Sequence, residues 1–343
     1  MGKYSFSLVV VAVFINLCFW VSCKPDSEIA PAQEFSFHIP EGWPQPVYNF
    51  ENNTLSQKGF NLGKRLFFDP ILSRTHTVSC GSCHQQFSAF AHKDHNVSHG
   101  VDDLLGTRNA PPLFNLNWHP EFFWDGGVNH IENQPINPIQ NPVEMDETLE
   151  NVLAKLQADS SYRAEFAAVF GDETINTQRV FKAIAQYMGM LLSTDAPYDQ
   201  YMRQEASLSD EAIEGMKVFN KHCATCHKPP LFTDFSYRNN GIAPTIVNDS
   251  GRALITRNVN DLYKFKVPSL RNLKYTPPYM HDGRFNTLEE VLDHYATGIH
   301  QSATLDPQLI SGIQLSKEER SYLLAFLHTL NDEHFVTNPL YKE

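Results

Sequence analysis

Two short motifs in the chain have the residue types and the spacing that attach haem covalently. Both read Cys-x-x-Cys-His, and they lie at residues 80–84 and 223–227. Two thiols two residues apart can bond to the two vinyl groups of one haem, and the histidine that follows is then held against the iron as its proximal ligand. The alternative is a four-cysteine zinc site, which two Cys-x-x-Cys pairs could also form.

The histidine directly after both cysteine pairs argues for haem and against zinc. We therefore predict two covalently bound haem c groups. The residues that would hold them are Cys80, Cys83 and His84 in the first motif and Cys223, Cys226 and His227 in the second. Two haems can serve electron transfer alone, whereas peroxide chemistry also needs acid–base groups beside a haem face that can open.

The first 23 residues have the pattern of a bacterial export signal. Lys3 supplies a positive charge, and the apolar run from residue 6 to residue 20 is short for a membrane span. The run ends in a small-residue step before Cys23, as in lipoprotein signals whose cysteine is lipidated; an ordinary cleaved signal peptide is the alternative. We expect a periplasmic protein anchored to the membrane through Cys23.

Composition narrows the class of protein further. The chain has 343 residues, 42% of them hydrophobic, and a formal net charge of −12. That length and apolar content suffice for two domains with real cores. A strongly acidic protein repels phosphate backbones, so we do not expect nucleic acid as a partner.

The elements that must position the two motifs read as helices. Helical periodicity is clear over residues 148–170 and 178–192. Capping boxes at Thr287 with Glu290 and at Ser316 with Glu319 predict two further helix starts. Long loops rich in proline, asparagine and glycine lie at 93–146 and 228–283, and loops of this length usually shape a site. The fold class expected is therefore all-α with long loops.

Similar segments precede the two motifs. Gly63-Lys64-Arg65-Leu66-Phe67 comes before the first motif and Gly215-Met216-Lys217-Val218-Phe219 before the second. The similarity indicates two cytochrome c-like domains from a duplication. We expect a tether and arm at 24–54, a first haem domain at 55–200 and a second at 201–343.

The long loops resemble those of the bacterial di-haem cytochrome c peroxidases and the related MauG proteins. The likeness runs from about residue 55 to 330. The segments that carry it are Phe122-Phe123-Trp124-Asp125-Gly126-Gly127, Asn141-Pro142-Val143-Glu144-Met145, Val267-Pro268-Ser269-Leu270-Arg271-Asn272 and Pro278-Tyr279-Met280-His281-Asp282-Gly283.

The resemblance implies an active site at the first haem. Glu144 matches the distal glutamate, which moves a proton between the two peroxide oxygens as the O–O bond breaks. Gln134 matches a residue that hydrogen-bonds in the distal pocket, and Pro138 matches a residue of the pocket wall. Trp124 matches a tryptophan between the haems that can pass electrons.

The resemblance also implies a calcium site at the domain junction. Its ligands would be the amide oxygen of Asn109 and the backbone carbonyls of Thr276 and Pro278. These are hard oxygen donors of the kind that calcium prefers, and waters would complete the shell.

Members of this family differ in the side chain that serves as the sixth ligand of the second haem. The peroxidases have a methionine fourteen positions after the histidine of the His-Asp-Gly motif, where this chain has Tyr295, as the MauG proteins do. A phenolate favours ferric and higher iron states, whereas methionine raises the potential. Met280 and His294 are the alternatives, although His294 would point about 100° away from Tyr295 on a helix.

At the first haem, resting peroxidases often carry a distal histidine that leaves on activation. His99 is nearest to the expected place, with His92 and His95 close by in the sequence. If none of them binds, the haem is five-coordinate and ready for peroxide.

Three functions follow as hypotheses. The first is a peroxidase that reduces hydrogen peroxide with electrons from a small cytochrome c or cupredoxin, passed through the second haem. The second is a MauG-like enzyme that oxidises a protein substrate, and the third is an electron-transfer cytochrome without catalysis. A homodimer is expected from the resemblance alone.

Overall fold

The protein is described by a computed structural model at residues 1–3 and 35–343. The predicted export signal, Cys23 and the first part of the predicted arm lie outside the described residues. Within the described part, no helix is both long enough and apolar enough to cross a membrane.

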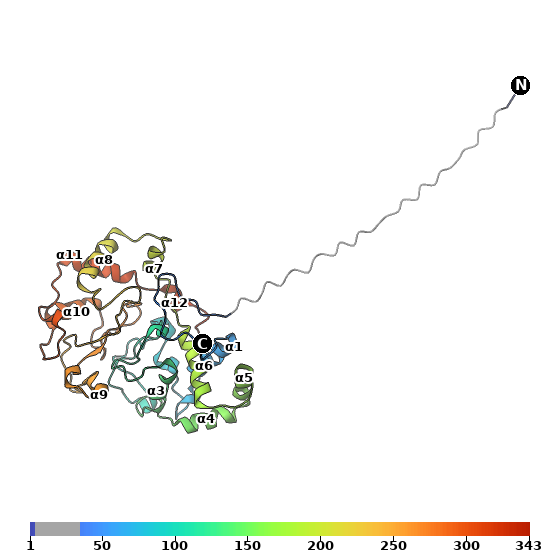
Figure 1. Cartoon of the computed structure of the whole chain (residues 1–343), viewed down its shortest axis with the longest axis horizontal. Helices are drawn as coiled ribbons and strands as arrows, with labels where there is room; N and C mark the ends of the chain where they lie inside the picture. The colour runs from blue at the N-terminus through green and yellow to red at the C-terminus, as the bar shows by residue number, and fades with distance from the viewer. Residues whose placement is uncertain (4–34) are drawn as a thin grey trace. The chain divides into compact units, whose positions relative to one another are not determined.

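Helices dominate the described residues, and the strands are very short (Figure 1). The α-helices are α1 Gln57–Phe68, α2 Cys80–Cys83, α3 Ile136–Gln140, α4 Leu149–Ala158, α5 Ser160–Phe170, α6 Thr177–Gly189, α7 Pro197–Met202, α8 Asp210–His222, α9 Ala253–Thr256, α10 Leu288–Asp293, α11 Lys317–His328 and α12 Glu333–Thr337. Strands β1 Tyr237–Arg238 and β2 Phe265–Lys266 pair antiparallel. The expectation of a mostly helical protein with long loops is confirmed.

Local sequence explains where these helices begin. Thr287 and Ser316 cap α10 and α11 in reciprocal capping boxes with Glu290 and Glu319, as predicted. The periodic run at 148–170 is two helices rather than one, because Asp159 ends α4 and its carboxylate accepts the N–H groups that open α5.

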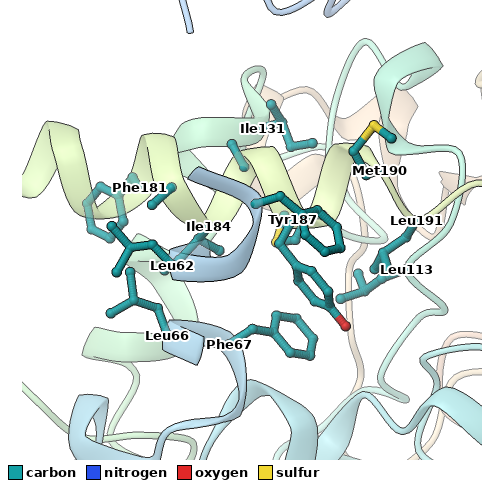
Figure 2. Close-up of a cluster of buried hydrophobic side chains, with 14 of the residues drawn as sticks. Leu62, Leu66, Phe67, Leu113, Ile131, Phe181, Ile184, Tyr187, Met190 and Leu191 are labelled. Carbon is teal, nitrogen blue, oxygen red and sulfur yellow. The ribbon is translucent and has the colours of Figure 1, made fainter. Parts of the chain in front are cut away.

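The first hydrophobic core lies between α1 and α6. Figure 2 shows Leu62, Leu66 and Phe67 of α1 directed towards Ile184 and Tyr187 of α6. The rings of Phe67 and Tyr187 have centroids 5.0 Å apart. A Cβ on Gly63 would lie 1.9 Å from the carbonyl oxygen of Ala183, so only glycine lets the two helices cross this closely.

The second core repeats this arrangement with α8 and α11. A Cβ on Gly215 would lie 1.9 Å from the carbonyl oxygen of Tyr322 on α11. Four residues after that glycine, Phe219 packs against Phe326 with ring centroids 5.0 Å apart. In each pair, the helix that carries the glycine, α1 or α8, comes before one Cys-x-x-Cys-His motif in the sequence.

Two turns of equal length also share one geometry. The ends of each turn form an isolated antiparallel bridge, at 122–128 and at 279–285. In each, the fifth residue is a glycine whose N–H donates to the carbonyl of the second residue, at 3.4 Å and 3.2 Å. The second residue has a positive φ in both, 64° at Phe123 and 75° at Met280.

The C-terminal segment returns to the first core. Figure 1 places the C-terminus beside α1 and α6, and the hydroxyl of Tyr187 donates to the carbonyl of Tyr341 at 2.8 Å. Phe335 of α12 packs on Phe90 with ring centroids 5.7 Å apart. The side-chain amide of Gln86 donates to the carbonyl of Asn338 at 2.7 Å. The last residues therefore support the loop that follows the first motif.

Candidate active site

The first motif presents its histidine in the form that binds iron. Cys80 and Cys83 bound the short helix α2, and His84 follows as its C-cap. Nδ1 of His84 lies 2.8 Å from the carbonyl of Phe90, and a carbonyl can only accept, so Nδ1 carries the proton. Nε2 is then left with a lone pair for a metal. Burial lowers the pKa of His84 to about 4, which keeps the ring neutral.

This histidine lines a cavity that is partly open to solvent. The cavity brings together seven of the predicted residues: Cys80, Cys83, His84, His99, Gln134, Pro138 and Glu144. Apolar side chains complete the walls, namely Phe67, Val78, Leu113, Met145 and Met188.

Glu144 supplies the carboxylate that lines this cavity. Hydrogen bonds hold both its backbone N–H and its backbone carbonyl. Its N–H donates to the carbonyl of Asn141 at 2.9 Å, and its own carbonyl accepts the N–H of Val101 at 2.7 Å. The amide of Asn141 donates to Oε1 of Glu144 at 2.8 Å. Burial raises the pKa of Glu144, and this hydrogen bond opposes the rise.

The three loop histidines differ in whether they line the cavity. His92, His95 and His99 form a cluster in which the rings of His92 and His95 stack with centroids 4.0 Å apart. Of these three, His99 is the one that lines the cavity. The structure thus brings His99 to the first motif, where the sequence left three histidines open.

Trp124 joins segments from both halves of the described chain. Its indole Nε1 donates to the carbonyl of Asn109 at 2.9 Å, and its carbonyl accepts the N–H of Lys266 at 2.7 Å. The N–H of Asn109 donates to the carbonyl of His281 at 2.8 Å. Trp124 therefore lies where the two halves meet, outside the cavity lining.

The residues expected to bind calcium lie on segments that lead to the same junction. Asn109 is buried, and its Nδ2 donates to the carbonyls of His95 and Asn96, each at 3.2 Å. Thr276 and Pro278, both buried, lie on the segment that leads to His281. Neutral oxygens of this kind suit calcium.

At the second motif, His227 is oriented as His84 is. Its Nδ1 lies 3.1 Å from the carbonyls of both Phe232 and Pro268. Nε2 is again left for a metal, and burial lowers the pKa of the ring. Both histidines thus offer the same nitrogen through the same kind of backbone contact.

Tyr295 lies near the cysteines of the second motif, on a π-helical turn. The α-helix α10 gives way at His294 to the π-helix η7, His294–Gly298, which carries Tyr295. Turns of this kind are frequent at functional sites. Burial raises the pKa of Tyr295 to about 12, a hydrogen bond with the Asn240 side chain opposes the rise, and the neighbouring Cys223 and Cys226 contribute to it.

His294 and Met280, the alternative ligands of the second haem, both contact Asn240. Nε2 of His294 lies 3.0 Å from the carbonyl of Asn240, so the imidazole donates there. Nδ2 of Asn240 lies 3.5 Å from the sulfur of Met280.

Sequence reasoning missed Asn240 and Asn141. Asn141, in the Asn-Pro step that begins three residues before Glu144, had a usable signal, whereas Asn240 stands in an ordinary Asn-Asn-Gly sequence.

The chain is similar to known proteins of one family. The family described as "Di-haem cytochrome c peroxidase" matches residues 57–207. "Methylamine utilization protein MauG" of Methylorubrum extorquens is 36% identical over 304 residues, covering 87% of this chain and 84% of that protein. "Cytochrome c551 peroxidase" of Nitrosomonas europaea is 32% identical, covering 79% of each chain.

A solved structure is similar over nearly the whole length. The crystal structure of "a MauG-like protein associated with microbial copper homeostasis" matches with a TM-score of 0.82 and 31% identity, covering 90% of this chain and 99% of that one. The chain therefore belongs to the di-haem cytochrome c peroxidase family. It is an oxidoreductase that acts on peroxide and carries two haem c groups. The neutral histidines and paired cysteines described above fit those groups.

Proposed function

We propose that this chain reduces hydrogen peroxide at the haem held by Cys80, Cys83 and His84. Electrons would arrive through the haem of His227 from a small cytochrome c or cupredoxin. The observation that carries this proposal is that Glu144 and Gln134 line one cavity together with the first motif. A carrier that only transfers electrons has no use for an acid–base carboxyl group and a hydrogen-bonding amide beside its haem.

The chain's own residues divide the work of peroxide reduction. The haem iron, when bound, supplies the site at which peroxide is held and its O–O bond is cleaved. Glu144 accepts the proton of the near oxygen and returns it to the far one, and Gln134 hydrogen-bonds the peroxide. Pro138 and the apolar walls exclude water. Two electrons and two further protons complete the conversion of one peroxide into two waters.

The test of this role is Glu144→Gln. The amide keeps the shape of the side chain but cannot shuttle a proton, so we expect peroxide turnover to fall by ~10²–10⁴-fold with both haems still attached. Steady-state peroxide reduction and haem content are the measurements. Glu150→Gln makes the same change at an exposed position and should leave turnover unaltered. Turnover at the wild-type rate in Glu144→Gln would exclude Glu144 as the acid–base group.

A second candidate function is the oxidation of a protein substrate, as the MauG resemblance implies. The position of Tyr295 beside Cys223 and Cys226 favours it, because a phenolate ligand supports oxidised iron. Peroxide added to the fully oxidised protein should then change the near-infrared and EPR spectra at once. If those spectra change only after one haem has been reduced, the first function is favoured instead.

Further parts of the proposal concern the whole protein. We infer that the halves 55–200 and 201–343 arose by duplication, and the two glycine-crossed helix pairs and the two equal turns support this. The export pattern supports a periplasmic location with an anchor at Cys23, and the resemblance supports a homodimer. A calcium ion would bind Asn109, Thr276 and Pro278.

A further inference from the structure

Arg108 joins the turn that carries Trp124 to the second half of the chain. Its Nη1 donates to Oδ2 of Asp125, the residue after Trp124, at 2.6 Å. Its Nε and Nη2 donate to the two carboxylate oxygens of Asp249 at 2.6 Å and 2.9 Å. One guanidinium therefore binds a carboxylate from each half, and its planar fork holds Asp249 at two points.

The residue after Arg108 holds the indole of Trp124. The carbonyl of Asn109 accepts the indole N–H at 2.9 Å, and the N–H of Asn109 donates to the carbonyl of His281 at 2.8 Å. Two consecutive residues thus fix Trp124, one through its indole and the other through the neighbouring Asp125. Both residues also contact the second half, so the indole is tied to that half through each of them.

The ion pairs of Arg108 are largely shielded from water. The side chains of Asp125 and Asp249 are only 12% and 10% exposed, and that of Arg108 is 21% exposed. Removal of one partner from a shielded ion pair leaves an uncompensated charge, which is costly. Without Arg108, two carboxylates that now share one guanidinium would lie close together and repel each other.

Two other cations of the second half contact the same turn, but they bind its backbone carbonyls. Arg252 donates from Nη1 to the carbonyl of Asp125 at 2.8 Å, and Lys266 donates from Nζ to the carbonyl of Glu121 at 2.9 Å. Among the described residues, no hydrogen bond from either cation reaches the carboxylate of Asp125. Arg108 is therefore the cation that ties this carboxylate to the second half.

We propose that Arg108 is a positioning residue that holds Trp124 in the route by which electrons pass between the two haems. In this step one electron leaves the second haem, which is oxidised, and reaches the first haem, which is reduced, while Arg108 exchanges neither electron nor proton. The rate depends on the distances that the electron must cross, so a shift of the indole changes it. The proposal rests on the proposed function, in which electrons reach the first haem through the second, with Trp124 between them.

The experiment replaces Arg108 by leucine in the full-length, haem-loaded protein. Stopped-flow spectroscopy follows oxidation of the pre-reduced second haem after peroxide is added, and hydrogen-exchange mass spectrometry follows the amides of residues 122–128 in the resting protein. We expect electron transfer to slow by ~10–100-fold, an effect that a displacement of about 1 Å is enough to cause. The turn should exchange faster because the link that holds it is lost, and the first haem should react with peroxide at the wild-type rate.

Trp124→Phe separates this role from a general loss of packing. In that background there is no indole to hold, so the addition of Arg108→Leu should slow electron transfer no further. A further slowing of the same size in the double variant would overturn the proposal, as would an unchanged rate in Arg108→Leu alone.

The same measurements separate the proposal from the assignments beneath it. If Trp124→Phe alone transfers electrons at the wild-type rate, Trp124 is not on the route, and the role of Arg108 falls with it. If peroxide never oxidises the second haem of the wild-type protein, the proposed function itself fails. Slow transfer in Trp124→Phe with unaltered transfer in Arg108→Leu removes the role of Arg108 alone.

Arg179→Leu is the matched control. Arg179 also donates from two nitrogens to one carboxylate, that of Asp172, at 2.6 Å and 2.9 Å. That carboxylate is 56% exposed, and the side-chain hydrogen bonds described for Arg179 lie within residues 172–179. Its loss should change neither the transfer rate nor the exchange of residues 122–128.

Arg108→Lys provides a second test should the leucine variant not load haem. A lysine keeps the charge but cannot form the fork that binds two carboxylates, so electron transfer should again be slower and the turn should exchange faster. A wild-type rate together with wild-type exchange in Arg108→Lys would contradict the proposal.

Discussion

At the scale of single residues, two opposing effects set the pKa of Glu144, the proposed acid–base group. Burial raises its pKa, while the amide of Asn141 at 2.8 Å stabilises the ionised form and limits the rise. A carboxyl group moved towards the working pH can both accept and return a proton, which the cleavage of peroxide requires. Asn141 therefore helps to set the pKa of Glu144.

Single residues also differ in how far the sequence could predict them. The motif histidines could be predicted, because ligand and anchor are adjacent in the chain. The resemblance singled out His99 among three histidines that lie within eight residues of one another, and His99 is the one of the three that lines the cavity. Asn240 could not be predicted, because its partners at 280 and 294 reach it only through the fold.

At the scale of elements, the sequence predicted helix starts better than helix interiors. Capping boxes are local, so those of α10 and α11 were evident. The break at Asp159 was hidden because α4 and α5 each keep an apolar face, and the periodicity runs through the junction. The π-helix after α10 was also missed, and it changes the separation of His294 and Tyr295 that a regular α-helix would give.

The crossing of α8 and α11 allows a direct test at this scale. In Gly215→Val, the new side chain would meet the backbone of α11 at Tyr322, which cannot move aside as a side chain can. We expect a loss of unfolding free energy of at least about 1–3 kcal/mol, the usual cost of overpacking. Thermal unfolding of the haem-loaded protein measures it. Asn220→Val adds the same side chain on the exposed face of α8 and should cost far less.

At the scale of the whole molecule, the junction of the two halves runs through Asn109. Its backbone contacts both Trp124 and His281, and its side-chain oxygen is the proposed calcium ligand. An ion there would fix the segment of Thr276 and Pro278 against Trp124. Loss of the ion should therefore loosen the route between the haems without releasing either of them.

Calcium removal tests this coupling. Treatment of the purified protein with a chelator should slow peroxide turnover while covalent haem content stays constant, and added calcium should restore the rate. Magnesium should restore it poorly, because it demands a smaller and more regular shell. Elemental analysis before and after treatment reports the ion itself. Full turnover in protein shown to be free of calcium would contradict the coupling.

The C-terminal segment has a consequence for how the protein is made. Phe335 packs on Phe90, the residue whose carbonyl orients His84, and Gln86 donates to Asn338. Chains generally fold from the N-terminus as they are synthesised. In this protein the loop beside the first haem can pack fully only after the last residues of the chain have been synthesised. The half that is synthesised first is therefore the last to complete its packing. A chain cut short before α12 would lose this support for the loop beside the first motif while keeping both attachment motifs intact.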